Sequence, residues 1–209
     1  MSRHKPYIVG LTGGIATGKS TASRHLTSLG AYCIDADQIA HDLMSAGGGA
    51  VEAIRRLFGD AVILPDGSVD RGQLGRIVFA DAALRRQLEG ITHPMVQHIT
   101  LECIEQAGKK GLPLVFLDVP LLFESGMDVL CDETWVVTLS RDRQLKRLIA
   151  RDHMAESDAQ TRIDSQMSQE EKARRATVTI DNGRSEERFK AELTALYHMA
   201  LRRAERENA

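Results

Sequence analysis

The stretch with the clearest chemistry is Gly13-Gly14-Ile15-Ala16-Thr17-Gly18-Lys19-Ser20, which matches G-x-x-x-x-G-K-[ST] at every fixed position. Glycines let backbone N–H groups converge on phosphate oxygens, and the N-terminus of a following helix adds the positive end of its dipole. We expect Lys19 to reach the β- and γ-phosphates of ATP from the solvent side, and the Ser20 hydroxyl to ligate Mg²⁺. Thr21 is expected to contact the α-phosphate. The motif therefore predicts a site for ATP and magnesium.

Three carboxylates follow short apolar runs. Asp35 and Asp37 come after the run that ends at Ile34, and Asp118 ends another run. Ligands of an open parallel sheet bind beyond the carboxyl ends of its strands, so a carboxylate there can act as general base on an attacking hydroxyl. If the strand continues through Asp35 and Asp37, both side chains point the same way. Alternatively, one of them caps a helix. Asp118 is either a carboxylate associated with magnesium or a turn residue. The residues alone leave these alternatives open.

A basic cluster lies in one predicted helix and comprises Arg141, Arg143, Lys146, Arg147 and Arg151. A solvated helix face is the ordinary explanation for such a run. Phosphoryl transfer, however, places guanidinium groups on the oxygens of the transferred phosphoryl group. Arg147 and Arg151 are one turn apart and share a face. We therefore expect at least one of them to contact phosphate.

Alternating strand and helix patterns must position these side chains. Short apolar runs predict strands at 7–11, 31–34, 114–118, 134–139 and 178–181. Helical patterns lie between or after them at 19–29, 142–151 and 185–206, and a capping box at 168–171 opens a short helix. Strands that alternate with helices predict an α/β fold of the P-loop NTPase type, with a parallel five-stranded sheet flanked by helices.

The segment 39–111 has no convincing strand pattern. Helices are predicted at 51–58, at 71–79 with Asp70 as N-cap, at 82–88, and at 94–107 with Pro94 in the first helical position. We therefore predict one kinase domain over 1–209, with a nucleotide-binding core at 1–38 and 112–209 and a helical, substrate-binding insertion at about 39–111.

Composition and charge limit the kinds of molecule that the chain is expected to bind. The 209 residues carry a formal net charge of −2 and only 4% aromatic residues, which argues against nucleic-acid and anionic-membrane partners. The three cysteines lack paired spacing, so a disulfide framework and a zinc site are not expected. The N-terminus enters an apolar strand without a signal-peptide pattern. The sequence predicts a cytoplasmic, monomeric protein with small-molecule substrates.

Together, the motifs resemble the dephospho-coenzyme A kinase family over nearly the whole chain. The resemblance rests on residues 11–15, 34–37, 70–71, 93–94, 118–124, 165–172 and 180–182, together with Leu74, Val78, Phe79, Gln144, Arg147, Arg151 and Arg162. It implies transfer of the ATP γ-phosphoryl group to the ribose 3′-hydroxyl of dephospho-coenzyme A, the last step of coenzyme A synthesis. It also implies a small lid at about 151–172.

The resemblance assigns roles to residues. Asp37 would be the general base, Lys19 with Arg147 or Arg151 would stabilise the phosphoryl group, and Asn182 would lie on the adenine side of ATP. The acceptor would lie near Thr12, Arg71, His93, Leu122 and Glu124. The sequence departs from the family pattern at two positions. Ala16 stands where glycine is frequent, which backbone N–H donation tolerates if φ is negative there, and Thr177 stands where aspartate is usual.

Two other functions compete with this one. The chain could be a kinase of nucleotides or of another small alcohol, or a P-loop switch protein that binds a partner protein. A GTPase switch would carry an N-K-x-D element after a late strand, and the sequence has none. An assay with dephospho-coenzyme A, AMP and adenosine side by side would separate the kinases.

Overall fold

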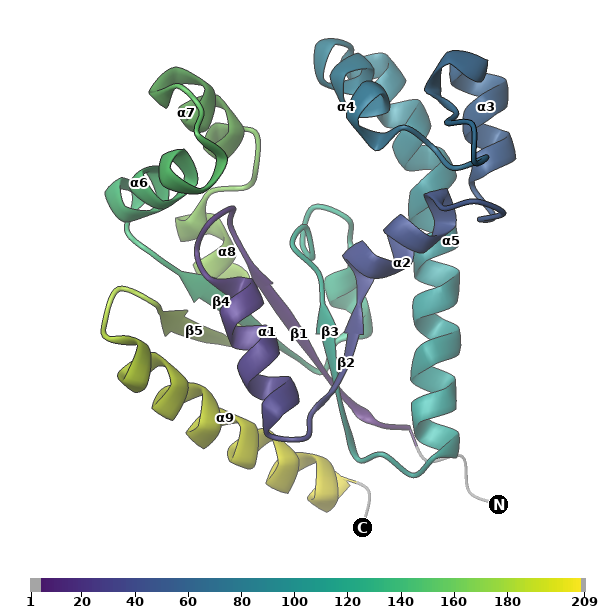
Figure 1. Ribbon diagram of the computed structural model, residues 1–209. Helices are drawn as coiled ribbons and strands as arrows, with labels where there is room; N and C mark the ends of the chain where they lie inside the picture. The colour runs from purple at the N-terminus through teal and green to yellow at the C-terminus, as the bar shows by residue number, and fades with distance from the viewer. Residues whose placement is uncertain (1–4, 208–209) are drawn as a thin grey trace. The chain divides into compact units, whose positions relative to one another are not determined.

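The computed structural model describes residues 5–207. The chain divides into two compact units. One unit contains the residues up to Ile34 together with those from Ile104 onward, and the other is Asp35–Cys103. The first unit carries the sheet, and the second is mainly helical (Figure 1).

β1 (Tyr7–Gly13) is the central strand of a five-stranded sheet with the order β2-β3-β1-β4-β5. The other strands are β2 (Tyr32–Asp35), β3 (Leu114–Asp118), β4 (Glu133–Thr138) and β5 (Val178–Asp181). β1 pairs in parallel with β3 and β4, and Leu11 lies opposite both Asp118 and Trp135. Every residue of β1 is buried, as expected for a strand covered on both faces. The predicted parallel five-stranded sheet is confirmed.

One face of the sheet is covered by α1 (Lys19–Ser28) and α9 (Glu186–Glu207), which lie side by side in Figure 1. Leu26 of α1 and Phe189 of α9 enter a core cluster with Val9, Phe116 and Trp135 of the sheet. The rings of Phe116 and Trp135 meet edge to face with centroids 5.2 Å apart. This core holds the strand that leads into the phosphate-binding motif.

The other face of β1 is closed partly by the chain that follows β3. A Cβ on Gly10 would lie 2.7 Å from both Cys131 Sγ and Leu122 Cδ2, so any larger residue would have to displace these two side chains. This chain includes the 3₁₀ helix η2 (Met127–Leu130). Burial raises the pKa of the Cys131 thiol to about 12.

Three short helices follow β4, namely α6 (Arg141–Asp152), α7 (Glu156–Asp164) and α8 (Gln169–Arg175). Ser168 caps α8 by accepting a hydrogen bond from Glu171 N at 3.1 Å, which confirms the predicted capping box start. α6 and α7 pack on each other through Leu148, Ala159 and Ile163.

The second unit comprises α2 (Ala36–Met44), α3 (Val51–Phe58), the 3₁₀ helix η1 (Asp60–Val62), α4 (Arg71–Ala80) and most of α5 (Ala82–Lys109). Asp70 caps α4 by accepting from Gln73 N at 2.9 Å, as predicted. Among the described residues of 39–111 the only β pairing is an isolated bridge between Ile63 and Val69.

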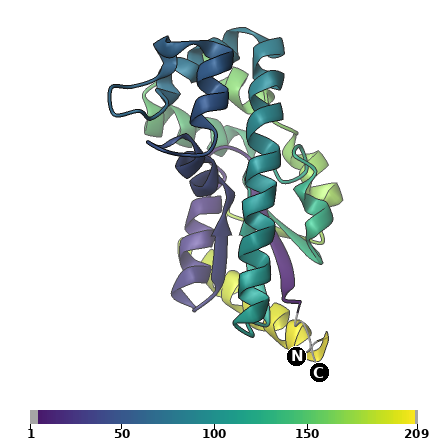
Figure 2. The same ribbon diagram turned by 90° about the vertical axis from the view of Figure 1, so that its right-hand side faces the viewer.

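The prediction of two helices at 82–88 and 94–107 is wrong. The structure has one helix, α5, with Pro94 inside it, and Figure 2 shows it running without interruption. Proline removes one backbone hydrogen bond and usually breaks a helix. Here a buried stripe at Thr92, Val96, Thr100 and Ile104 continues past the proline at helical spacing, so burial outweighs the local signal.

Among residues 5–207, no helix combines the length and apolar character needed to cross a bilayer.

Candidate active site

The predicted P-loop lies at the carboxyl end of β1 and leads directly into α1. Its turn is closed by Thr17, whose hydroxyl and backbone N–H both donate to Gly14 O, at 2.8 Å and 3.2 Å. Thr17 is fully buried, so its side chain shapes the loop. The first turn of α1 contains no acidic residue, which leaves the positive end of the helix dipole uncompensated for an anion.

Two glutamines hold the middle of the loop. Gln144 of α6 donates from Nε2 to Ile15 O at 2.6 Å, and Ile15 N donates to Gln166 Oε1 at 2.8 Å. Gln144 is only 2% exposed. Both backbone polar groups of Ile15 are therefore bound by side chains from outside the loop.

Asn182 supports the end of the loop. Its Nδ2 donates to Thr17 O at 2.7 Å, and the residue is buried. Gly18 has a φ of +105°, and a Cβ on it would lie 2.1 Å from that Nδ2. The resemblance assigns Asn182 to the adenine side of ATP. In the structure its amide nitrogen holds the P-loop, and an ATP contact by Asn182 stays a prediction.

Lys19 and Asp118 form an ion pair through Nζ and Oδ1. The side chains are 13% and 4% exposed, so the expectation that Lys19 lies on the solvent side is wrong. Asp118 is the last residue of β3, and β3 neighbours β1, so sheet order alone brings the two residues together. A lysine that is this little exposed is a strong positive charge for phosphate if Asp118 is otherwise occupied when nucleotide binds.

The condition attached to Ala16 is not met. Its φ is +60°, in the left-handed region that favours glycine. Its side chain packs against the cluster of Leu148, Ala159 and Ile163, together with that of Ile15. We infer that this packing holds the residue in a backbone conformation that costs a non-glycine residue about 1 kcal/mol or more.

Asp35 and Asp37 do not lie on one continuous strand. β2 ends at Asp35, and α2 begins at Ala36. Asp35 caps α2, because its side chain accepts from Gln38 N at 3.1 Å. Asp37 is exposed in the first turn of that helix. The helix-capping alternative thus applies to Asp35, and the base assignment for Asp37 stays a prediction.

The arginines of α6 have different surroundings. Arg147 Nη1 lies 3.7 Å from the position a Cβ on Gly18 would take, so its guanidinium is beside the P-loop. Arg151 forms two hydrogen bonds with Asp152, at 2.6 Å and 2.9 Å. That pairing raises the pKa of the Arg151 guanidinium and lowers the pKa of the Asp152 carboxyl. Of the two candidates, Arg147 is therefore placed beside the P-loop, and Arg151 is paired with Asp152.

The residues assigned to the acceptor fall in several places. Arg71 and His93 are exposed on α4 and α5 of the second unit. Thr12 is buried and donates from its hydroxyl to Pro120 O at 2.9 Å. Leu122 is fully buried and contributes to the core, so it offers no surface to a ligand here. Glu124 forms an ion pair with Lys172 at 2.8 Å.

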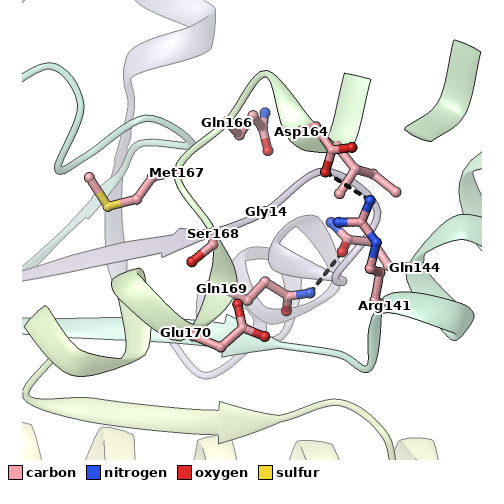
Figure 3. A pocket seen from close by; sticks show the side chains of 10 residues that line it. Gly14, Arg141, Gln144, Asp164, Gln166, Met167, Ser168, Gln169 and Glu170 are labelled. Atoms are coloured by element: carbon pink, nitrogen blue, oxygen red, sulfur yellow. Dashed lines mark hydrogen bonds and ion pairs between the residues drawn. The ribbon is translucent and has the colours of Figure 1, made fainter. Parts of the chain in front are cut away.

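A cavity of about 150 Å³ adjoins the loop (Figure 3). Its walls come from Gly14, from Gln144 and Arg141 of α6, and from residues 163–164 and 166–170. Two interactions join residues that line the cavity. Gln169 Nε2 donates to Gln144 Oε1 at 2.7 Å, and Arg141 pairs with Asp164 at 2.8 Å.

A magnesium ion fits the donor set at the loop. Ser20 offers a hydroxyl and Asp118 a carboxylate, and Mg²⁺ prefers oxygen ligands supplemented by water and substrate phosphates. Within residues 5–207, no group of three or more His, Cys, Asp and Glu side chains is arranged to hold a metal. Magnesium that is held partly by nucleotide phosphates does not need such a group.

Four residues of the stretches that resemble the family have no functional role predicted from the sequence, namely Gln144, Gln166, Gln169 and Lys172. Their contacts are with backbone groups far away in the chain, such as Ile15, Leu139 and Pro120. The one available signal was an uncharged amide, Gln144, in the middle of the basic cluster of α6.

The sheet order, the loop between β1 and α1, and the lysine paired with the aspartate of β3 define a P-loop nucleotide-binding α/β protein. The model of the dephospho-CoA kinase family matches residues 7–187. The chain belongs to the dephospho-CoA kinase family.

Named relatives agree with this assignment. A dephospho-CoA kinase of Symbiobacterium thermophilum is 50% identical over 92% of this chain and 81% of its own length. One from Geobacter sulfurreducens is 42% identical over 91% and 96%. A solved dephospho-CoA kinase from Campylobacter jejuni superposes with a TM-score of 0.66 at 28% identity, covering 94% of this chain and 98% of that one. A Thermus thermophilus structure reaches a TM-score of 0.79 at 34% identity, covering 93% and 97%.

Proposed function

We propose that this chain transfers the γ-phosphoryl group of ATP to the ribose 3′-hydroxyl of dephospho-coenzyme A, giving ADP and coenzyme A. The observation that carries the proposal is an intact, braced P-loop in a chain that matches the family model over residues 7–187. The relatives that share this length of sequence are named for the same reaction.

The nucleotide side of the reaction falls to the P-loop. Backbone N–H groups at the end of the P-loop and the start of α1 would bind the phosphates, and Lys19 would leave Asp118 to contact the β- and γ-phosphates. Ser20 and Asp118 would hold Mg²⁺, which when bound neutralises charge on the phosphate oxygens. Arg147, beside Gly18, would contact the transferred phosphoryl group, because a guanidinium can bind two of its oxygens at once.

The acceptor side falls to Asp37, which would take the proton of the attacking hydroxyl as general base. Arg71 and His93 would contact the acceptor, with Thr12 and Glu124 shaping the chain that follows β3.

The variants Arg147→Lys and Arg151→Lys show which of the two arginines contacts the transferred phosphoryl group. We expect a loss of kcat only for Arg147→Lys, because Arg151 is engaged by Asp152.

The deciding experiment compares acceptors. ADP formation would be measured with dephospho-coenzyme A, AMP and adenosine at equal concentrations, and the product would be identified by mass. Dephospho-coenzyme A should be preferred by at least a hundredfold in kcat/KM. Comparable rates with AMP would instead support a general nucleotide kinase.

Three further expectations accompany this function. The segment at about 39–111 would be the acceptor-binding part of a single kinase domain, with a lid at about 151–172. The chain would act as a monomer in the cytoplasm, without nucleic-acid or membrane partners. Light scattering on the purified protein would test the monomer.

A further inference from the structure

The segment 165–172, hereafter the strap, connects α7 to the first turn of α8 and crosses between two loops. At one end Gln166 accepts a hydrogen bond from Ile15 N of the P-loop at 2.8 Å. The partner is a backbone N–H, which can only donate, so the side-chain atom that it meets must be the amide oxygen. The same logic makes the Gln144 atom that meets Ile15 O a nitrogen.

The other end of the strap is bound to the chain that follows β3. Met167 N donates to Glu124 Oε1 at 3.1 Å. Lys172 Nζ donates to Pro120 O at 2.9 Å and lies 2.8 Å from Glu124 Oε1. The Lys172 side chain is fully buried, so losing Glu124 would leave its charge unpaired in the interior. This anchor is therefore costly to release.

The middle of the strap is fixed to the sheet. Gln169 accepts from Leu139 N at 2.8 Å and donates to Leu139 O at 2.7 Å, just past the end of β4. Its Nε2 also donates to Gln144 Oε1 at 2.7 Å, as Figure 3 shows. The two glutamines thus link the strap, α6 and the P-loop into one hydrogen-bonded network.

Each of the two segments that the strap joins adjoins one member of the Lys19–Asp118 ion pair. Lys19 follows the P-loop, and Asp118 immediately precedes the chain at Pro120–Glu124. We propose that the strap is a brace that sets the P-loop against the chain after β3, with Gln166 and Gln144 as positioning residues for nucleotide binding. The proposal deepens the function proposed above and rests on it only for the turnover measurements.

A brace is needed because the P-loop is not relaxed. Ala16, next to Ile15, has a φ of +60°. Without the two glutamines, the peptide groups on either side of Ile15 can rotate, and the N–H groups aimed at phosphate turn with them. Nucleotide then binds only the fraction of molecules whose loop is correctly shaped, and its apparent Kd rises by the inverse of that fraction.

The first test removes the acceptor from the strap. Gln166→Leu should raise the Kd of magnesium-ATP by roughly tenfold, because the part-buried Ile15 N–H loses its acceptor. Gln166→Glu keeps an oxygen acceptor and should stay within about threefold of wild type. Gln160→Leu is the matched control on α7, because Gln160 is exposed and donates a hydrogen bond to Glu156 of its own helix, at 3.4 Å. The Kd would be measured directly with a fluorescent ATP analogue.

The second test uses the opposite polarity of Gln144. Gln144→Glu places a carboxylate against Ile15 O and should weaken ATP binding more than Gln166→Glu does. Lowering the pH from 8.5 to 6 should restore binding in part, because burial favours a protonated carboxyl that can donate. Arg141, Asp164 and Glu170 line the same cavity and are charged themselves. The ATP Kd of the wild-type protein is therefore measured at each pH as the reference.

These results separate a brace from ordinary structural support. A positioning role predicts that KM for ATP and the ATP Kd rise together while KM for dephospho-coenzyme A changes less than twofold. If Gln166→Leu lowers only the melting temperature and binds ATP like Gln160→Leu, the proposal is overturned. Equal ATP affinities for Gln144→Glu and Gln166→Glu at pH 8.5 would overturn it as well. The ATP Kd tests the positioning role of the strap even if dephospho-coenzyme A is not the acceptor. One result can therefore refute the strap proposal without refuting the proposed function, and the reverse.

Discussion

Replacing Gly18 by alanine is a perturbation whose effect follows directly from the geometry of the P-loop. The new Cβ would lie 2.1 Å from Asn182 Nδ2 and 3.2 Å from Asn182 Cγ, at a φ of +105°. Asn182 is 7% exposed and donates to Thr17 O at 2.7 Å, so its amide cannot retreat without losing that hydrogen bond. The substitution therefore strains the backbone and breaks a buried contact at once.

Two contributions lower the free energy of unfolding. The left-handed backbone costs a non-glycine residue about 1–2 kcal/mol. Displacing Asn182 leaves a buried donor and acceptor unpaired, at about 1–3 kcal/mol. The sum of about 2–5 kcal/mol corresponds to a fall in Tm of roughly 5–20 °C for a chain of this size. Gly30→Ala is the control, since Gly30 has a φ of +92° but no atom within 4 Å of its Cβ position. Its Tm should fall by only roughly 2–8 °C.

Thermal unfolding followed by circular dichroism measures both variants, and a double-mutant cycle identifies the clash. Adding Asn182→Ala to Gly18→Ala should cost less than Asn182→Ala alone, because removing the amide relieves the contact. The reasoning is refuted if Gly18→Ala and Gly30→Ala lower Tm equally, or if the two effects in the cycle are additive.

Four other substitutions have defined outcomes. Lys19→Ala should lower kcat by at least about a hundredfold, and a residual rate above about a tenth of wild type would contradict its role. Asp37→Asn should lower kcat by about 10²–10⁴ with ATP affinity within a few-fold, whereas Asp35→Ala should mainly lower stability, by about 0.5–2 kcal/mol; the reverse result would exchange the roles. For Cys131, the folded pKa of about 12 exceeds the ordinary value of 9.0, so unfolding releases a proton between these values and stability falls as pH rises through this window. Denaturant titrations from pH 8 to 10.5 should show a shallower decline for Cys131→Ala than for wild type.

Local signals in the sequence were enough for much of the fold. The match to the P-loop pattern, the N-cap at Asp70 and the apolar run at 178–181 each depend on residues within a few positions, and each gives the element that the structure contains. Neighbouring residues determine caps and turns directly, so these predictions need no knowledge of tertiary contacts.

Features that depend on distant residues were missed or misjudged. Pro94 indicates a helix start, but the buried stripe of α5 extends through it. The ion pair between Lys19 and Asp118 joins residues that are 99 positions apart. The hydrogen bond from Gln144 to Ile15 O joins residues that are 129 positions apart. A sequence pattern within one element contains no information on such pairs, and the site was therefore predicted as a set of residues without its supports.

The strand order has a consequence for the newly made chain. β1 and β2 are consecutive in sequence, yet β3 lies between them, and the other neighbour of β1 is β4. Tyr7 pairs with Leu114, so the first strand cannot find any partner until synthesis has passed that residue. At about 5–20 residues per second the delay is roughly 5–20 s. During this time an apolar strand that is fully buried in the finished protein stays exposed, while residues 35–103 are already complete and able to collapse. Early aggregation, and any chaperone that prevents it, should therefore involve the first dozen residues.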